Sequence, residues 1–303
     1  MTLTLRGCGT AIITPLTPDG EVDDEALRRH VAWQLEQGVD FLVPCGSTGE
    51  AQTLRPREQR RVVETVVEEV DGQAPVVGGV SGNFTARTVE EAREMALWGV
   101  DAVMVVTPYY NKPTQEGMER HFLAVADTCP RPILMYTVPG RTAVHIAPET
   151  VLRLARHPNI LGIKDATGDL HWAMSILRAR PKGFSVLSGE DGIALPHLAC
   201  GGDGLISVTA NVAPGAVARL VERGLAGDFT AAREIQLRLL PLMDTLFGET
   251  NPIPAKAALH LMGRIHNELR LPLVPASPHT VERLRDLLAQ EITREQNARN
   301  GMT

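Results

Sequence analysis

The chain has 303 residues, of which 44% are hydrophobic and 22% charged, and these values are typical of a folded globular protein with a large core. Its formal net charge of −6 argues against a nucleic acid or a membrane surface as a partner. No apolar stretch approaches the roughly 20 residues that span a bilayer, and Met1–Arg6 lacks the apolar segment of a secretory signal.

Short apolar runs alternate with helical patterns over most of the chain. Buried parallel strands are apolar on both faces and are bounded by turn residues, and eight segments fit that description. We expect strands at Gly9–Thr14, Phe41–Pro44, Val76–Gly79, Ala102–Val106, Pro132–Tyr136, Ile160–Lys164, Phe184–Ser188 and Gly204–Ser207.

Amphipathic segments lie between these strands. Asp23 is placed to cap a helix that carries Leu27 and Val31 on one face. Thr88 and Glu91 match the spacing of a capping box at the start of another helix. Further apolar stripes predict two more helices, at Val62, Val63, Val66, Val67 and Val70 and at Phe122, Val125 and Ala126.

Repeated strand–helix units predict an α/β protein with a parallel sheet and right-handed crossovers. Eight such units favour a closed (β/α)8 TIM barrel, and a doubly wound sheet is the alternative; no GxGxxG follows an early strand, so a Rossmann fold is less favoured. We therefore predict a catalytic barrel over residues 1–223. A C-terminal helical region should follow over residues 224–303, with helices at Ala231–Phe247, Pro254–Met262 and Thr280–Glu291.

Lys164 closes one of the apolar runs, which places its amine at the carboxyl end of a buried strand. Desolvation disfavours the ammonium form, so the pKa should fall, and a free amine in a pocket forms Schiff bases with ketones. A lysine that reaches solvent or pairs with Asp165 would give the same pattern. In a barrel, however, chemistry sits at the carboxyl ends of strands. This sequence also places Thr14, Ser47, Thr48, Tyr109, Tyr110, Tyr136, Arg141 and Gly189 there.

Each of these neighbours allows two interpretations. The glycines of Gly46–Glu50 let successive amides point at an anion, although an ordinary capped loop would look the same. Tyr109 and Tyr110 carry hydroxyls that can pass protons, or they cover the barrel mouth as part of a rigid loop. Arg141 suits a carboxylate because its paired donors match two oxygens, but it also suits a surface ion pair.

The four cysteines, Cys8, Cys45, Cys129 and Cys200, are widely spaced and form no CxxC pair. Nine histidines are present without an HExxH or similar cluster. We interpret the cysteines as reduced thiols of a cytoplasmic protein, and we predict no metal site.

Five motifs occur in chain order: Ser47–Glu50, Thr107–Asn111, Tyr136–Thr142, Gly162–Gly168 and Leu205–Asn211. Together they resemble the dihydrodipicolinate synthase (4-hydroxy-tetrahydrodipicolinate synthase) family, pyruvate-dependent class I aldolases of lysine biosynthesis. The resemblance runs from about Gly9 to Pro275 and includes Asn251–Lys256. Lys164 alone would mark only the wider superfamily, which also holds N-acetylneuraminate lyase and sugar-acid aldolases; Tyr110 and Arg141 separate the synthase from these relatives.

The resemblance implies a lyase in which Lys164 forms a Schiff base with pyruvate. The resulting enamine would attack L-aspartate 4-semialdehyde and give 4-hydroxy-tetrahydrodipicolinate, on the diaminopimelate route to lysine. Tyr136 would transfer protons, linked to Ser47 and to Tyr110 of the partner subunit as a hydroxyl relay.

The resemblance also implies the binding residues and the assembly. The backbone amides of Ser47 and Thr48 would hold the carboxylate of pyruvate, and Arg141 that of the semialdehyde. Gly189, Glu190 and Ile206 would line the pocket. No metal or organic cofactor is implied, because the iminium itself is the electron sink. The expected assembly is a homotetramer built from two tight dimers.

The sequence departs from the family pattern at a few positions. Ser47 replaces the usual threonine but keeps its hydroxyl. Thr137 replaces the usual asparagine, which leaves the exact aldehyde substrate open. Lysine-regulated members bind lysine with a serine, a histidine and a glutamate, where this chain has Ala51, Pro56 and Arg87. A cation in place of the glutamate should repel lysine, so we expect weak or absent lysine inhibition.

Two other functions fit the same residues less well. The first is another Schiff-base aldolase or dehydratase of the superfamily, acting on a 2-keto sugar acid. The second is a non-catalytic sensor or scaffold that binds a keto acid. Turnover of pyruvate with aspartate semialdehyde, compared with turnover of sugar acids, separates these possibilities.

Overall fold

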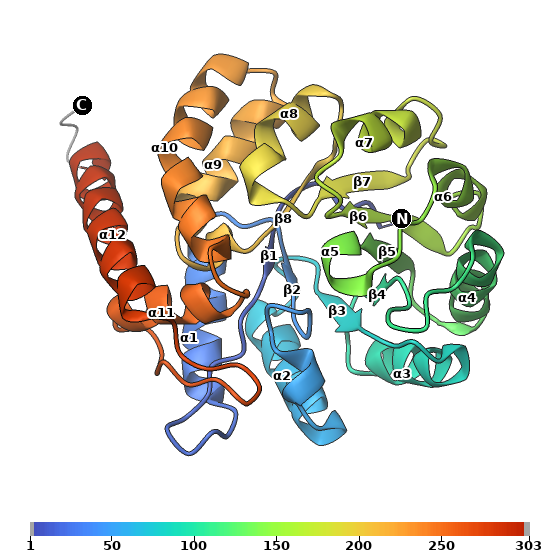
Figure 1. Cartoon of the computed structure of the whole chain (residues 1–303), viewed down its shortest axis with the longest axis horizontal. Helices are drawn as coiled ribbons and strands as arrows, with labels where there is room; N and C mark the ends of the chain where they lie inside the picture. The colour runs from blue at the N-terminus through green and yellow to red at the C-terminus, as the bar shows by residue number, and fades with distance from the viewer. Residues whose placement is uncertain (1–2, 300–303) are drawn as a thin grey trace.

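The computed structural model describes residues 3–299, with side chains described up to residue 291. Eight parallel strands form one sheet in the order β2-β1-β8-β7-β6-β5-β4-β3, and a bridge between Leu42 and Val76 joins its two edges into a barrel (Figure 1). The strands are β1 Gly7–Ala11, β2 Phe41–Val43, β3 Val77–Val80, β4 Ala102–Val106, β5 Ile133–Thr137, β6 Ile160–Asp165, β7 Ser185–Ser188 and β8 Gly204–Ser207.

The predicted (β/α)8 barrel is therefore confirmed. All eight expected strands are present, and the largest error is at β1, which ends at Ala11 rather than Thr14. The helices of the barrel are α1 Asp24–Glu36, α2 Pro56–Val70, α3 Thr85–Leu97, α4 Gln115–Thr128, α5 Pro139–Thr142, α6 Pro148–Leu154, α7 Leu170–Leu177, α8 Ala194–Ala199 and α9 Pro214–Leu225.

One predicted cap is confirmed and one is wrong. Asp23 caps α1, because its Oδ1 accepts a hydrogen bond from the Ala26 backbone N–H at 3.0 Å. Thr88, in contrast, lies inside α3, which begins at Thr85. Its hydroxyl donates to the Phe84 carbonyl one turn back, at 3.1 Å. The capping-box spacing therefore recurred within a helix instead of marking its start.

Side chains alternate along the strands between the barrel interior and the layer beneath the helices. On β5, Leu134 and Tyr136 belong to the interior cluster, and Ile133 and Met135 pack in the outer layer. Thr137 follows the outer set by this alternation and is fully buried. Its difference from the family pattern therefore bears on packing against the helices and not on the wall of the pocket.

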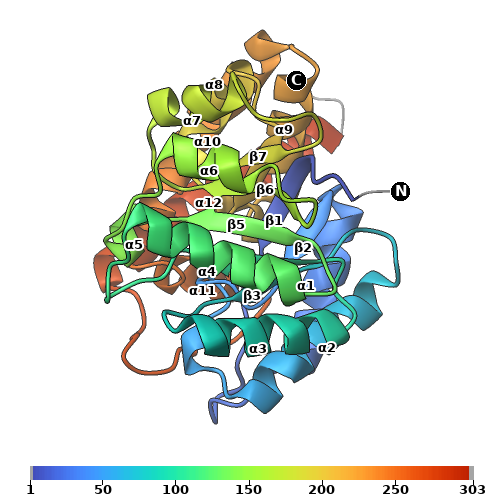
Figure 2. The same ribbon diagram turned by 90° about the vertical axis from the view of Figure 1, so that its right-hand side faces the viewer.

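Three C-terminal helices cover one side of the barrel, beside α9 and α1 (Figures 1 and 2). A buried cluster joins them to α8, α9 and the first and last strands, with Leu205 on β8 and Leu239, Leu242 and Leu259 on the added helices. The predicted helices are confirmed as α10 Phe229–Phe247, α11 Ile253–Leu261 and α12 Pro278–Arg299. The division of the chain at residue 223 stays a prediction. Within residues 3–299 no helix is long and apolar enough to cross a membrane.

Three histidines, His30, His121 and His197, are buried and have pKa values of about 4, mainly because burial disfavours the imidazolium. At His197 the nearby Asp203 opposes this effect and Arg180 adds to it. The folded-state pKa lies below the unfolded value of about 6.5, so the folded chain binds fewer protons between these values. The contribution of these neutral histidines to the free energy of unfolding is therefore fully present above about pH 6.5, and it is lost as the pH drops toward 4.

We predict that thermal unfolding midpoints fall steadily between pH 6.5 and 4. Replacing His197, whose two ring nitrogens have no hydrogen-bond partner among the described residues, should reduce that loss. The His197→Leu variant should lose up to about 3 kcal/mol less unfolding free energy over this range than the original chain. Urea unfolding at several pH values measures the difference, and an unchanged pH slope in the variant would contradict the prediction.

Candidate active site

Lys164 and Tyr136 lie side by side at the carboxyl ends of two neighbouring strands. The register of β5 and β6 pairs Tyr136 with Lys164, and the lysine Nζ lies 4.4 Å from the centroid of the tyrosine ring. Only 6% of Lys164 and 7% of Tyr136 is exposed. The predicted placement of a buried amine beside a phenol is therefore confirmed.

Burial lowers the pKa of Lys164 to about 8. The negative charges of Asp191 and Glu190 act in the opposite direction, and the positive charge of Arg141 adds to the lowering. About a tenth of the lysine is then a free amine at pH 7. The alternative pairing with Asp165 is wrong: the ion pairs of the described residues include none between Lys164 and Asp165, whose carboxylate accepts a hydrogen bond from the Thr167 backbone N–H at 2.8 Å. A lysine that is 6% exposed does not reach solvent either.

The Tyr136 hydroxyl keeps its proton at neutral pH. Burial raises the pKa of Tyr136 to about 12, and the negative charge of Glu190 adds to this increase. The positive charge of Arg141 and the interaction with the Ser47 hydroxyl lower the pKa and so act against it. A neutral phenol beside an amine can donate a proton and take one back through the serine hydroxyl. This arrangement suits chemistry in which a carbonyl oxygen must leave as water.

The Gly46–Glu50 loop holds two predicted site residues after β2. It is a tight turn in which the Gly49 N–H donates to the Gly46 carbonyl at 3.1 Å and the Glu50 N–H to the Ser47 carbonyl at 3.2 Å. Thr48 is buried, with 3% of its surface exposed. An added Cβ at Gly49 would come within 3.1 Å of the carbonyl of Ile12, just after β1, so this close approach favours glycine.

Ser47 and Arg141 line one cavity of about 280 Å³. Arg141 forms no ion pair with a carboxylate of the described residues, so the guanidinium remains available to an anionic ligand; the surface ion pair considered from the sequence is wrong. The cavity is also lined by residues of the barrel loops and the C-terminal region: Glu50, Gln52, Thr53, Ser81, Val106, Tyr109, Val138, Thr142, Thr250, Asn251, Pro272 and Leu273.

The remaining predicted residues differ in how they meet the site. Gly189 lies against Lys164, and an added Cβ would come within 2.8 Å of the lysine Cε. Glu190 is partly buried, which raises the pKa of its carboxyl, and Ile206 is buried in the barrel interior. Tyr110 is not brought to this cavity: it is 89% exposed, with a left-handed φ of 67°. In its own chain the neighbouring Tyr109 lines the cavity instead.

Two further residues take part in the site and were not predicted. The Asn251 side chain donates from Nδ2 to the Thr48 hydroxyl at 2.9 Å. The Asn251 backbone carbonyl accepts a hydrogen bond from Arg141 Nη2 at 3.0 Å. Asp191 is fully buried, and its carboxylate accepts hydrogen bonds from the backbone N–H groups of Val208 and Thr209. The only sequence signal for Asp191 was an acidic residue next to Glu190 after a strand.

The dihydrodipicolinate synthetase family model matches residues 4–291. A 4-hydroxy-tetrahydrodipicolinate synthase of Koribacter versatilis is 47% identical over 94% of this chain and 96% of its own length. One from Geobacter sulfurreducens is 49% identical over 90% and 93%. Among solved structures, dihydrodipicolinate synthase from Thermotoga maritima has a TM-score of 0.93 at 44% identity, covering 95% of this chain and 99% of that one.

We predict that Lys164 titrates about two pH units below an ordinary lysine side chain, whose pKa is about 10.4. The chain has four lysines, Lys112, Lys164, Lys182 and Lys256, so NMR of protein labelled with ¹³C at lysine Cε gives few signals. The signal that disappears in a Lys164→Met variant should show a midpoint near pH 8. A midpoint above about 10 would mean that burial does not release the amine.

Proposed function

The chain belongs to the dihydrodipicolinate synthetase family, and we propose that it condenses pyruvate with L-aspartate 4-semialdehyde to form 4-hydroxy-tetrahydrodipicolinate. It is a lyase of the class I aldolase type, and its product feeds the diaminopimelate route to lysine. The observation that carries this proposal is the amine of Lys164, which is buried next to Tyr136 and has a pKa of about 8.

Lys164 starts the reaction. Its free amine adds to the ketone carbon of pyruvate, and loss of water leaves an iminium. Loss of a proton from the methyl carbon then gives an enamine, whose carbon attacks the aldehyde of the semialdehyde and forms the new carbon–carbon bond. The amino group of the second substrate closes the ring on the iminium carbon and releases Lys164.

Tyr136 and Ser47 move the protons that these steps require. Tyr136 protonates the departing hydroxyl and recovers a proton through the neighbouring hydroxyl of Ser47, whose interaction lowers the pKa of Tyr136. Because the pKa of Tyr136 is about 12, its proton is held until the reacting oxygen develops basic character. Asp191 and Glu190 offset the positive charge of the iminium in this buried place.

Carboxylate groups fix both substrates. The backbone amides of Ser47 and Thr48 hold the carboxylate of pyruvate, and Arg141 holds that of the semialdehyde. The Asn251 contacts support this assignment, because its side chain binds Thr48 and its backbone carbonyl binds Arg141, so one residue holds both binding groups in place. Gly189, Glu190 and Ile206 form the wall beside the lysine.

Tyr110 completes the relay in the site of a neighbouring subunit. Its 89% exposure and left-handed backbone support this role, since a large aromatic ring displayed on the surface is placed to enter a second chain. The assembly is a homotetramer made of two tight dimers. The enzyme works in the cytoplasm, consistent with its four free cysteines.

A turnover panel tests the proposed reaction. Purified enzyme should convert pyruvate with aspartate semialdehyde, and it should leave N-acetylneuraminate and 2-keto-3-deoxygluconate unchanged. Faster turnover of either sugar acid would identify a different aldolase of the superfamily. A zero rate with every substrate, although pyruvate binds, would identify a non-catalytic binding protein.

The Tyr110→Phe change should lower turnover about 10²-fold or more with little loss of stability, because it removes one hydroxyl from a surface residue. Mixing this variant with inactive Lys164→Ala subunits should then restore activity. A mixed dimer has one site with both Lys164 and Tyr110 intact, so random exchange gives about a quarter of the original rate. Failure to restore activity after confirmed subunit exchange would show that Tyr110 serves its own chain or no site.

Lysine should inhibit this enzyme weakly or not at all. Arg87, where regulated members have glutamate, is exposed on α3 and ion-paired with Glu91 at 2.7 Å. A cation there repels the ammonium groups of lysine. Initial rates measured with increasing lysine should stay constant below millimolar concentrations, and clear inhibition in that range would contradict the prediction.

A further inference from the structure

A buried charged network includes Glu50, the last residue of the Gly46–Glu50 loop that carries Ser47, and Glu50 lines the same cavity as Ser47. Lys256 on α11 forms an ion pair with Glu50, and the two side chains are 0% and 2% exposed. The second carboxylate oxygen of Glu50 accepts a hydrogen bond from the Arg270 backbone N–H at 3.3 Å. Lys256 also donates to the Glu268 carbonyl at 2.9 Å. The C-terminal region therefore contacts both oxygens of one buried carboxylate in the barrel.

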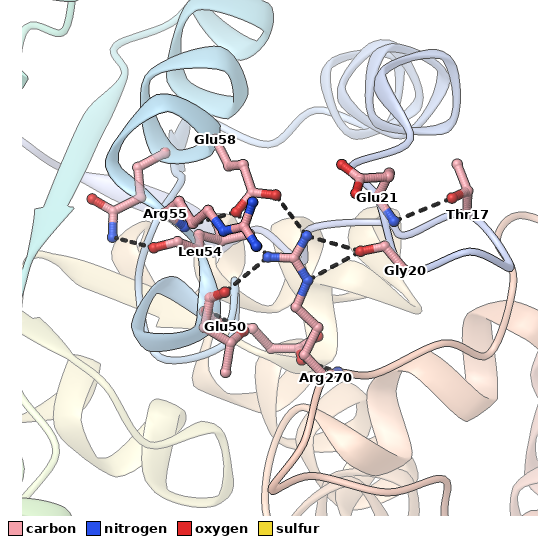
Figure 3. Close-up of polar contacts among 10 residues, drawn as sticks. Thr17, Gly20, Glu21, Glu50, Leu54, Arg55, Glu58 and Arg270 are labelled. Atoms are coloured by element: carbon pink, nitrogen blue, oxygen red, sulfur yellow. Dashed lines mark hydrogen bonds and ion pairs between the residues drawn. The ribbon is translucent and has the colours of Figure 1, made fainter.

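Arg270 extends this network to the rest of the barrel mouth (Figure 3). Its guanidinium donates to the Gly20 carbonyl from two nitrogens, at 3.0 and 2.8 Å, and to the Thr53 carbonyl at 2.8 Å. Two further bonds, of 2.8 and 2.7 Å, reach the two carboxylate oxygens of Glu58 on α2. One side chain thus ties the loop after β1, the loop after β2 and the start of α2 to the C-terminal segment.

The network acts on the backbone that holds Ser47. Glu50 has a left-handed φ of 54°, a conformation that a non-glycine residue adopts at a cost. Its own N–H donates to the Ser47 carbonyl at 3.2 Å, and its carbonyl accepts from the Thr53 N–H at 2.9 Å. Fixing the Glu50 carboxylate from two sides therefore fixes the turn, and with it the direction of the Ser47 hydroxyl.

We propose that Glu50 is a positioning residue, whose carboxylate, held by Lys256 and Arg270, sets the Ser47 hydroxyl for proton transfer to Tyr136. This inference rests on the proposed function, because it assigns the network to that reaction. A stability role alone explains the network poorly, since a buried ion pair often adds little compared with apolar residues of the same size. What such a pair provides here is one fixed geometry at a strained turn.

Variants for the test must remove the charge without leaving another charge alone. Glu50→Gln by itself leaves the Lys256 ammonium buried and unpaired, and that chain can fail to fold. The test variant is therefore Glu50→Gln/Lys256→Met. The control is Asp203→Asn, which weakens the Arg180–Asp203 ion pair just before β8, at the opposite end of the barrel from the site. Unfolding midpoints of both variants are measured first, and rates are compared well below them.

We expect the test variant to lose kcat and the control variant to keep it, although both lose a similar amount of stability. The Glu50→Gln/Lys256→Met enzyme should lose on the order of tenfold to a hundredfold in kcat, as expected when a reacting group is displaced by up to about 1 Å. Asp203→Asn should keep its kcat within about twofold at a similar loss of midpoint. A comparable fall of kcat in the control, or no fall in the test variant, would overturn the proposal.

A double-mutant cycle with Ser47→Ala identifies the residue through which Glu50 acts. If the network works through the Ser47 hydroxyl, adding Glu50→Gln/Lys256→Met to Ser47→Ala should change kcat by less than about twofold. Effects that multiply would show that the network acts elsewhere and would overturn the proposal. If the unmodified enzyme turns over pyruvate and aspartate semialdehyde, that result leaves the proposed function intact; an inactive unmodified enzyme would remove both.

Discussion

The site depends on keeping one ammonium group away from water. Lys164 is enclosed by the barrel interior, and the cost of burying its charge lowers its pKa to about 8. The carboxylates of Asp191 and Glu190 limit this effect, so the amine is poised between its two forms near neutral pH. The same carboxylates then stand near the positive iminium that the reaction creates. The same burial and the same two carboxylates therefore supply a free amine for the attack on the ketone and stabilise the iminium that results.

The barrel places the partners of this amine with little freedom. Tyr136 is paired with Lys164 in the register of adjacent strands, so the contact between them follows from the sheet itself. The remaining groups come from loops, which need support. Much of that support comes from the C-terminal region: Asn251 contacts Thr48 and Arg141, and Lys256 and Arg270 contact Glu50. The added helices thus help to build the barrel mouth, besides covering the side of the barrel.

The sequence predicted the barrel and the core of the site, because both follow from local patterns. Apolar runs mark strands, consecutive parallel strands are neighbours, and their carboxyl ends meet at one face; these rules suffice to join Lys164 with Tyr136. The contacts of Asn251 and Arg270 could not be predicted, since they join residues about 200 positions apart through loops without periodicity. The direction of the Thr137 side chain, away from the barrel interior, could not be predicted without the register of the strand. Thr88 was misplaced because the capping spacing also occurs within helices. The role of Tyr110 involves a second chain and stays a prediction.

Covalent capture of the ketone shows whether the amine of Lys164 forms a Schiff base with pyruvate. The enzyme is treated with borohydride in the presence of pyruvate and then digested, and the masses of its peptides are measured by mass spectrometry. A reduced pyruvate adduct should form on Lys164, and it should be absent when either reagent is left out. An unmodified Lys164 peptide after full treatment, or an adduct found only on another lysine, would contradict this expectation.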